Sequence, residues 1–275
     1  MKNLLMIGAV LLSCAASALE MQNIAHRGMW DKQVPQNTVE AIRRAYDAGA
    51  TWVETDFWHL KNGLKIVMHA QKELEKQTLT TKKVQNLTAE DLATLNLGAG
   101  EKLEKVYRIP TWEQVLSVVP KKGGVLQAEI KGYSPQYADL FDQAVKAAGL
   151  TEENIVVSSF QYAALKDFKA RYPKYRTVWL VALNKKKAFD VKQAIADCQA
   201  AHFEVYCPGA STTVVMTPAD ADAIRAAGIE FRCYGVNSVQ DLVQAKKMGA
   251  VGFTCNYWHK AFEWAQEVGG VTLKK

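Results

Sequence analysis

The fold of this chain is constrained most by short apolar stretches that alternate with helix-like segments. Eight of these stretches have the composition expected of β-strands. They span Asn23–Gly28, Trp52–Trp58, Val125–Lys131, Ile155–Phe160, Thr177–Ala182, Phe203–Cys207, Phe231–Val236 and Val251–Thr254. Eight strands alternating with helices in a chain of 275 residues are typical of a (β/α)8 TIM barrel. We therefore expect an α/β fold built on such a barrel.

The helical segments carry recognisable start and stop signals. The segment Asn37–Ala48 is expected to form a helix in which Asn37 and Glu40 have the spacing of a capping box. Gly49 follows as the stop. Two later helices that are likewise followed by a glycine are expected at Gln136–Ala148 and Ala219–Ala227.

One segment interrupts the alternation after the second strand. Asn62-Gly63, flanked by apolar residues, predicts a hairpin that leads directly into Lys65–His69. A parallel neighbour would need a crossover of about a dozen residues or more, and the sequence has no room for one. We therefore expect His69 on an excursion from the barrel mouth, within an insertion over about residues 59–110 that precedes the helix Thr111–Val119.

Residues 1–18 have the features of an export signal. Lys2 gives a positive start, Leu4–Leu12 form an apolar stretch too short to span a bilayer, and Ala16-Ser17-Ala18 is a small-residue cleavage site. We therefore expect a periplasmic or secreted protein with a mature barrel domain over residues 19–275. In the alternative interpretation, Leu11-Leu12-Ser13-Cys14 is a lipoprotein signal, and Cys14 tethers the protein to a membrane.

The net charge indicates the class of partner, and the spacing of the cysteines bears on whether they form a zinc site. The net charge of +6 is mild and scattered, which favours a small anionic substrate over nucleic acid. The four cysteines after the signal do not have the spacing of a zinc site, and we interpret them as buried thiols. They are Cys198, Cys207, Cys233 and Cys255.

Polar clusters stand at the ends of the apolar stretches in the first half of the chain. They are His26-Arg27-Gly28, Glu54-x-Asp56, His69 and Glu129-x-Lys131. Residues i and i+2 of a strand share a face, so Glu54 and Asp56 point the same way. At the ends of neighbouring strands these clusters would converge on one mouth, where Gly28 would let the backbone approach a ligand.

Carboxylates that face a barrel interior need a positive partner. Glu54, Asp56 and Glu129 offer only oxygen ligands, which suit a hard divalent cation, calcium or magnesium. The alternative is a buried ion-pair network with Arg27 and Lys131.

The remaining polar residues of the clusters suit phosphate chemistry. His26 and His69 are candidates for a general base and a general acid, because an unperturbed imidazole titrates near neutrality. The alternative for each is a strand-end histidine bonded to backbone. Arg27 and Lys131 are candidates for binding phosphoryl oxygens, Arg as a fork and Lys as a point charge.

Taken in order, these motifs resemble the glycerophosphodiester phosphodiesterase family. The match rests on Ile24-Ala25-His26-Arg27-Gly28, Pro35-Gln36-Asn37-Thr38, Val53-Glu54-Thr55-Asp56, Ile66-Val67-Met68-His69, Ile109-Pro110-Thr111, Ala128-Glu129-Ile130-Lys131 and Gly252-Phe253-Thr254. The resemblance implies a divalent ion on the three acids, an acid–base pair formed by His26 and His69, and phosphate binding by Arg27 and Lys131. The implied reaction hydrolyses a glycerophosphodiester to glycerol 3-phosphate and an alcohol.

Three positions depart from the family pattern. Gln36 replaces a usual Glu, Ala70 follows the second histidine in place of Asp, and Cys255 follows Thr254 where Asp is usual. Two alternatives stay open. One is a phospholipase-like diesterase acting on intact lipid or inositol headgroups, which lipidation at Cys14 would favour. The other is an extracytoplasmic binding protein that retains the metal without catalysis, which the changes at Gln36 and Ala70 motivate.

Overall fold

The computed structural model describes residues 18–132, 134 and 136–275. Residues 1–17 of the expected export signal, which include Cys14, lie outside the described residues. Among the described residues, no helix combines the length and apolar character needed to cross a bilayer.

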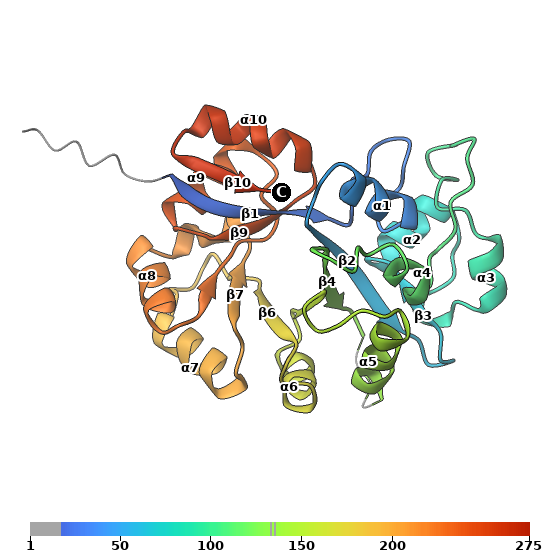
Figure 1. The fold of residues 1–275 in the computed structure, drawn as a ribbon, viewed down its shortest axis with the longest axis horizontal. Coiled ribbons are helices and arrows are strands. Elements are labelled where there is room, and N and C mark those ends of the chain that lie inside the picture. The colour runs from blue at the N-terminus through green and yellow to red at the C-terminus, as the bar shows by residue number, and fades with distance from the viewer. Residues whose placement is uncertain (1–17, 133, 135) are drawn as a thin grey trace, which may run out of the picture.

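Parallel strands form a barrel at the centre of the molecule (Figure 1). They are β1 (Leu19–His26), β2 (Trp52–His59), β4 (Val125–Ile130), β5 (Ile155–Ser159), β6 (Arg176–Val181), β7 (Val205–Pro208), β8 (Glu230–Phe231) and β9 (Gly252–Cys255). Each strand pairs with the next around the ring, β9 pairs with β1, and the bridge between Cys233 and Phe253 joins the extension of β8 to β9. The expected (β/α)8 barrel is confirmed.

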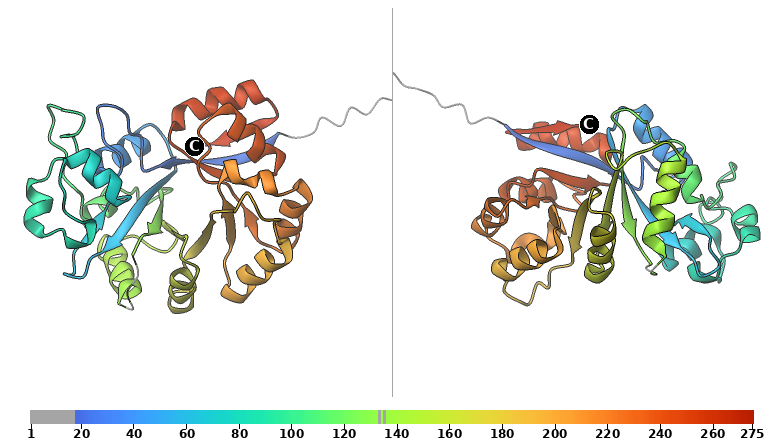
Figure 2. Two further views of the ribbon diagram at one scale, coloured as in Figure 1. Left: turned by 180° about the vertical axis from the view of Figure 1, so that it is seen from behind. Right: turned by 60° about the horizontal axis from the view of Figure 1, so that its bottom comes forward.

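Helices surround this barrel, as the views in Figure 2 show from two further sides. They are α1 (Val39–Asp47), α4 (Trp112–Leu116), α5 (Tyr137–Ala147), α6 (Tyr162–Arg171), α7 (Val191–Ala201), η2 (Ala210–Val215), α8 (Pro218–Ala226), α9 (Val239–Lys247) and α10 (Trp258–Val268). A short strand that the pattern did not predict, β10 (Val271–Lys274), pairs with the start of β1. Side chains of β10 alternate between partly covered and exposed. A strand this short and this exposed has no run of buried apolar residues, so its sequence signal is weak.

The segment between β2 and α4 contains β3 (Lys65–Val67), α2 (Gln71–Thr78), η1 (Val84–Asn86) and α3 (Ala89–Thr94). The strand β3 pairs antiparallel with β2, as the Asn62-Gly63 hairpin signal predicted. This segment has a small apolar core of its own, which includes Leu60, Ile66 and Leu74. His69 therefore stands on the insertion and not on a barrel strand.

The start of α1 differs from the expected capping box. The N-cap is Thr38, whose side chain accepts a hydrogen bond from the backbone N–H of Ala41. Asn37 lies in the left-handed region at φ 59°, and its side chain turns away from the helix toward Asp56. The expected capping role of Asn37 with Glu40 is wrong because the buried carboxylate of Asp56 takes the Asn37 amide.

The alternation along β2 separates the core from the mouth. Phe57 points outward and packs edge-on against Trp112 and Tyr137, with ring centroids 4.9 and 5.1 Å away. The neighbouring Asp56 points to the opposite face. The four cysteines Cys198, Cys207, Cys233 and Cys255 are free, buried thiols, as expected.

Candidate active site

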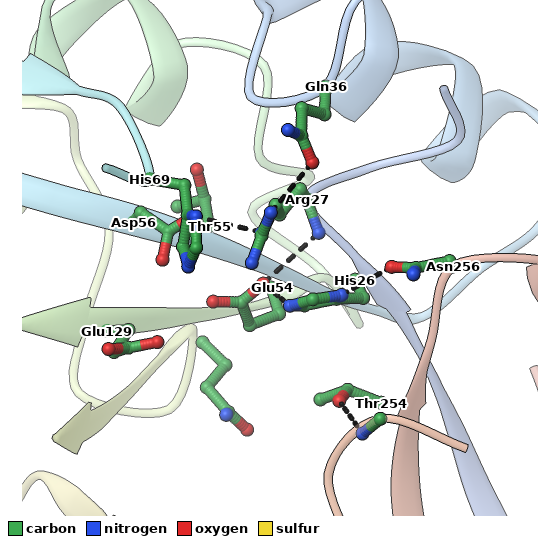
Figure 3. Close-up of polar contacts among 12 residues, drawn as sticks. His26, Arg27, Gln36, Glu54, Thr55, Asp56, His69, Glu129, Thr254 and Asn256 are labelled. Carbon is green, nitrogen blue, oxygen red and sulfur yellow. Dashed lines mark hydrogen bonds and ion pairs between the residues drawn. The ribbon is translucent and has the colours of Figure 1, made fainter. Parts of the chain in front are cut away.

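Three carboxylates meet at the carboxyl ends of two neighbouring strands (Figure 3). Glu54 and Asp56 lie on β2, and the strand register places Asp56 directly beside Glu129 on β4. One oxygen from each carboxylate lies within 4.8 Å of the other two. All three side chains are buried, with exposed fractions of 3%, 0% and 7% for Glu54, Asp56 and Glu129. The structure thus brings together the trio that the sequence pattern indicated.

Crowding these acids in a buried site has a clear electrostatic effect. Burial and the negative charges of Asp56 and Glu129 raise the pKa of Glu54 well above its usual range. Burial and the charge of Asp56 raise the pKa of Glu129 to about 7. Burial also opposes ionisation of Asp56, but the charges of Lys131 and Arg27 outweigh it and lower the pKa of Asp56 to about 2.

Two cations contact the trio. The Nε of Arg27 lies 3.3 Å from Oδ2 of Asp56, and Nζ of Lys131 lies 3.0 Å from Oδ1 of Asp56 and 2.6 Å from Oε1 of Glu129. The ion-pair network considered from the sequence is therefore present. Ionisation of all three carboxylates would leave one negative charge beyond the two cations, and the raised pKa values of Glu54 and Glu129 reflect the lack of further positive charge in this buried site. A divalent cation fits this all-oxygen donor set.

His26 is the last residue of β1 and faces the trio. Its Nε2 lies 3.7 Å from Oε2 of Glu54, and its Nδ1 lies 2.5 Å from Oδ1 of Asn256. Burial and the nearby charge of Arg27 lower the pKa of His26 to about 3, so the ring is neutral near pH 7. Because an amide oxygen only accepts, the Nδ1 of the neutral ring donates to Asn256 and Nε2 keeps its lone pair.

His69 reaches the same site from the insertion. Figure 3 shows its ring beside Asp56, with His26 beside Glu54. The Nδ1 of His69 lies 2.8 Å from Oε2 of Glu73 on α2. The partners of both histidines are thus side chains and not the backbone groups of the alternative interpretation.

Three residues that sequence reasoning did not assign to the site also contact it. The Nδ2 of Asn37 donates to Oδ2 of Asp56 at 2.7 Å, while Glu73 and Asn256 contact the two histidines. A signal existed for Glu73, because it lies four residues after His69 at the start of a helix. Asn256 carried only the weaker signal of standing just past a barrel strand.

Gln36 and Gly28 also have structural roles. Gln36 accepts a hydrogen bond from Nη1 of Arg27 at 2.8 Å, so it holds the guanidinium without adding charge. A Cβ on Gly28 would lie 2.5 Å from the carbonyl carbon of Ala41. The close approach at Gly28 is therefore made to helix α1, while the expected approach of its backbone to a ligand stays a prediction.

A cavity of about 630 Å³ adjoins these supporting residues. It lies between the loop after β1, the insertion and the start of α10, and Gln36, Glu73 and Asn256 form part of its wall. Trp30 and Tyr257 add aromatic surface. The cavity is large enough for a small organic group, and its wall includes Glu73 and Asn256, which contact the two histidines.

The model of the glycerophosphoryl diester phosphodiesterase family matches residues 26–260. The chain belongs to this family, which confirms the resemblance carried by its motifs.

Relatives of known sequence agree with this assignment. A glycerophosphodiester phosphodiesterase of Caldanaerobacter subterraneus subsp. tengcongensis is 33% identical over 154 residues, which cover 54% of this chain and 62% of the relative. One from Bacillus subtilis is 25% identical over 255 residues, which cover 85% of this chain and 83% of the relative. The chain thus matches less than two thirds of the first relative's length.

Solved structures share the fold. A putative glycerophosphoryl diester phosphodiesterase from Silicibacter pomeroyi superposes with a TM-score of 0.77 at 19% identity, covering 93% of this chain and 95% of that one. A phosphodiesterase from Oleispira antarctica, in complex with the product sn-glycerol-3-phosphate, superposes with a TM-score of 0.74 at 20% identity. The superposition covers 89% of this chain and 96% of that one.

Proposed function

We propose that this protein hydrolyses glycerophosphodiesters to glycerol 3-phosphate and an alcohol. One observation carries the proposal: Glu54, Asp56 and Glu129 share one site with two histidines and two cations. The substrate class is supported by family membership and by the glycerol 3-phosphate bound to the Oleispira antarctica phosphodiesterase.

Glu54, Asp56 and Glu129 would hold one divalent cation, calcium or magnesium. When bound, such an ion draws electron density from the phosphoryl oxygens and neutralises charge that develops on them. Arg27 and Lys131 add their positive charges on the same side of the site and bind phosphoryl oxygens.

His26 and His69 act as the acid–base pair. One neutral imidazole takes the proton of the nucleophile as its oxygen bonds to phosphorus, and the other, which carries a proton on both ring nitrogens before this step, gives one of them to the alkoxide as the ester P–O bond breaks. Water as nucleophile yields glycerol 3-phosphate directly. A substrate hydroxyl as nucleophile yields a cyclic phosphate first. Phosphorus NMR of the reaction distinguishes the two routes, because only the second produces a cyclic phosphate signal.

The test is incubation of the purified protein with glycerophosphocholine, with calcium, with magnesium and with a chelator. We expect release of glycerol 3-phosphate that the chelator abolishes. Tight binding of the diester without product would overturn the proposal in favour of a binding protein. Product from intact phospholipid alone would overturn it in favour of a phospholipase-like enzyme.

We also infer that the protein is exported, from Lys2, Leu4–Leu12 and Ala16-Ser17-Ala18. Mass spectrometry of the protein recovered after expression in a bacterium tests this location. A chain that begins at Leu19 would support plain export, whereas a chain that begins with a lipidated Cys14 would support a membrane tether. An uncleaved N-terminus would contradict both.

A further inference from the structure

A fourth carboxylate touches the active site although it is not part of the expected set. The two oxygens of Glu73 contact different residues of that set. Oε2 lies 2.8 Å from Nδ1 of His69, and Oε1 lies 3.3 Å from Nη1 of Arg27. Glu73 lies outside the trio of potential metal ligands. It therefore touches two residues proposed to act on substrate without being a candidate to hold the ion.

The local structure explains why Glu73 reaches His69. Helix α2 begins at Gln71, directly after Ala70, and Glu73 lies in its first turn. A residue four positions after His69 at the start of a helix comes back over the preceding turn. A negative side chain in the first turn is also favoured by the helix dipole. The side chain of Ala70, which follows His69 directly, has no polar atom that could take this place.

A carboxylate at Nδ1 has a defined consequence for an imidazole. The partner of one ring nitrogen sets which nitrogen carries the proton in the neutral ring. An ionised carboxylate only accepts, so its place beside Nδ1 favours the neutral tautomer of His69 that carries the proton on Nδ1 and leaves Nε2 to exchange a proton. The arrangement matches that of His26, where the oxygen of Asn256 faces Nδ1. The two histidines differ because the partner at Nδ1 is a carboxylate for His69 and an amide oxygen for His26.

We propose that Glu73 is a positioning residue that fixes the tautomer and orientation of His69 and holds Arg27 beside it. This inference rests on the proposed function, because it assumes that His69 transfers a proton. It also gives the insertion a role, since α2 places Glu73 and the segment just before α2 places His69 at the barrel mouth.

The kinetic test compares E73A and E73Q with E75Q in the full-length protein. Glu75 lies on the same helix, and its Oε1 accepts from Gln71, so E75Q is a matched control that should keep wild-type activity. E73A should lower kcat for glycerophosphocholine by about 10- to 100-fold, the range typical when a partner that orients a histidine is removed. The kcat of E73Q should lie between those of E73A and the wild type, because the amide oxygen of Gln can accept a hydrogen bond from Nδ1 of His69. Calcium affinity, measured by titration calorimetry, should stay unchanged.

A spectroscopic readout separates positioning from mere stability. In protein labelled with ¹⁵N at histidine, His69 should show the Nδ1–H tautomer, E73Q should retain it, and E73A should lose it. A kcat of E73A within about twofold of wild type, or an unaltered His69 tautomer in E73A, would overturn the inference. If the wild-type protein releases no glycerol 3-phosphate, the proposed function fails, and the tautomer alone decides whether Glu73 orients His69.

Discussion

At the scale of single residues, the two histidines carry the proposed chemistry. H26A and H69A should each lower kcat by about 10²- to 10⁴-fold, the contribution typical of a general acid or base. The fold should survive, because neither ring belongs to the apolar core. Steady-state kinetics with glycerophosphocholine and circular dichroism check the two expectations. Undiminished activity in both variants would refute their assignment.

Asn37 supports the site through Asp56. Its Nδ2 donates to the Asp56 carboxylate, its Oδ1 accepts from the Thr55 hydroxyl at 2.8 Å, and its backbone is left-handed. N37A should lower the free energy of unfolding by about 1–3 kcal/mol from unsatisfied buried groups, and by about 1–2 kcal/mol more from the left-handed backbone. N37G removes the side chain but relieves the backbone, so urea unfolding should place it between N37A and wild type. Equal stability of the wild type, N37A and N37G would contradict both the side-chain contribution and the backbone contribution.

At the scale of elements, Gly28 determines how closely α1 packs on the turn after β1. G28A should lower the free energy of unfolding by about 1–2 kcal/mol for its left-handed backbone and by about 1–3 kcal/mol for overlap with the backbone of Ala41. Gly63 is a matched control, with φ 85° against 82° for Gly28 and nothing within 4 Å of an added Cβ. G63A should therefore show only the backbone term. If urea unfolding shows a similar loss of unfolding free energy in G28A and G63A, helix α1 can shift to accommodate the added Cβ without measurable destabilisation.

Element boundaries show how far local patterns reach. The strand β2 was predicted by its composition, and its alternation correctly separated Asp56 from Phe57. The hairpin into β3 followed from Asn62-Gly63 because turn chemistry is local. The start of α1 was misjudged at Asn37, because a buried carboxylate from another element competed for its side chain.

At the scale of the whole molecule, a bound cation should stabilise the fold. A ligand that binds only the native state, at about 100 times its Kd, adds about 2.7 kcal/mol. Calcium or magnesium should therefore raise the thermal midpoint, and a chelator should reverse the change. E129Q should remove most of this shift, because Glu129 supplies one of the three clustered oxygens. A full shift in E129Q would contradict the proposed ion site.

Alkaline pH should destabilise the whole fold. Burial raises the pKa of Cys198, Cys207 and Cys255 from 9.0 to about 12. A raised pKa means that the folded state holds its proton while the unfolded chain loses it, so stability is present below pH 9 and is lost between about 9 and 12. Urea unfolding at steps from pH 8 to 11 should show a falling midpoint. A constant midpoint would indicate that the thiols are not buried in solution.

The order of strands and helices, the face of β2 that carries the acids and the polar clusters that meet at one site could be inferred from the chain alone. Each depends on patterns a few residues long or on motifs that keep their order. The partners of these residues could not be inferred in the same way. Asn256 meets His26 because barrel closure brings β9 beside β1, and Gly28 is needed because α1 folds back onto the turn after β1. Such contacts join residues far apart in the chain or on different elements, so they arise only when the elements pack together.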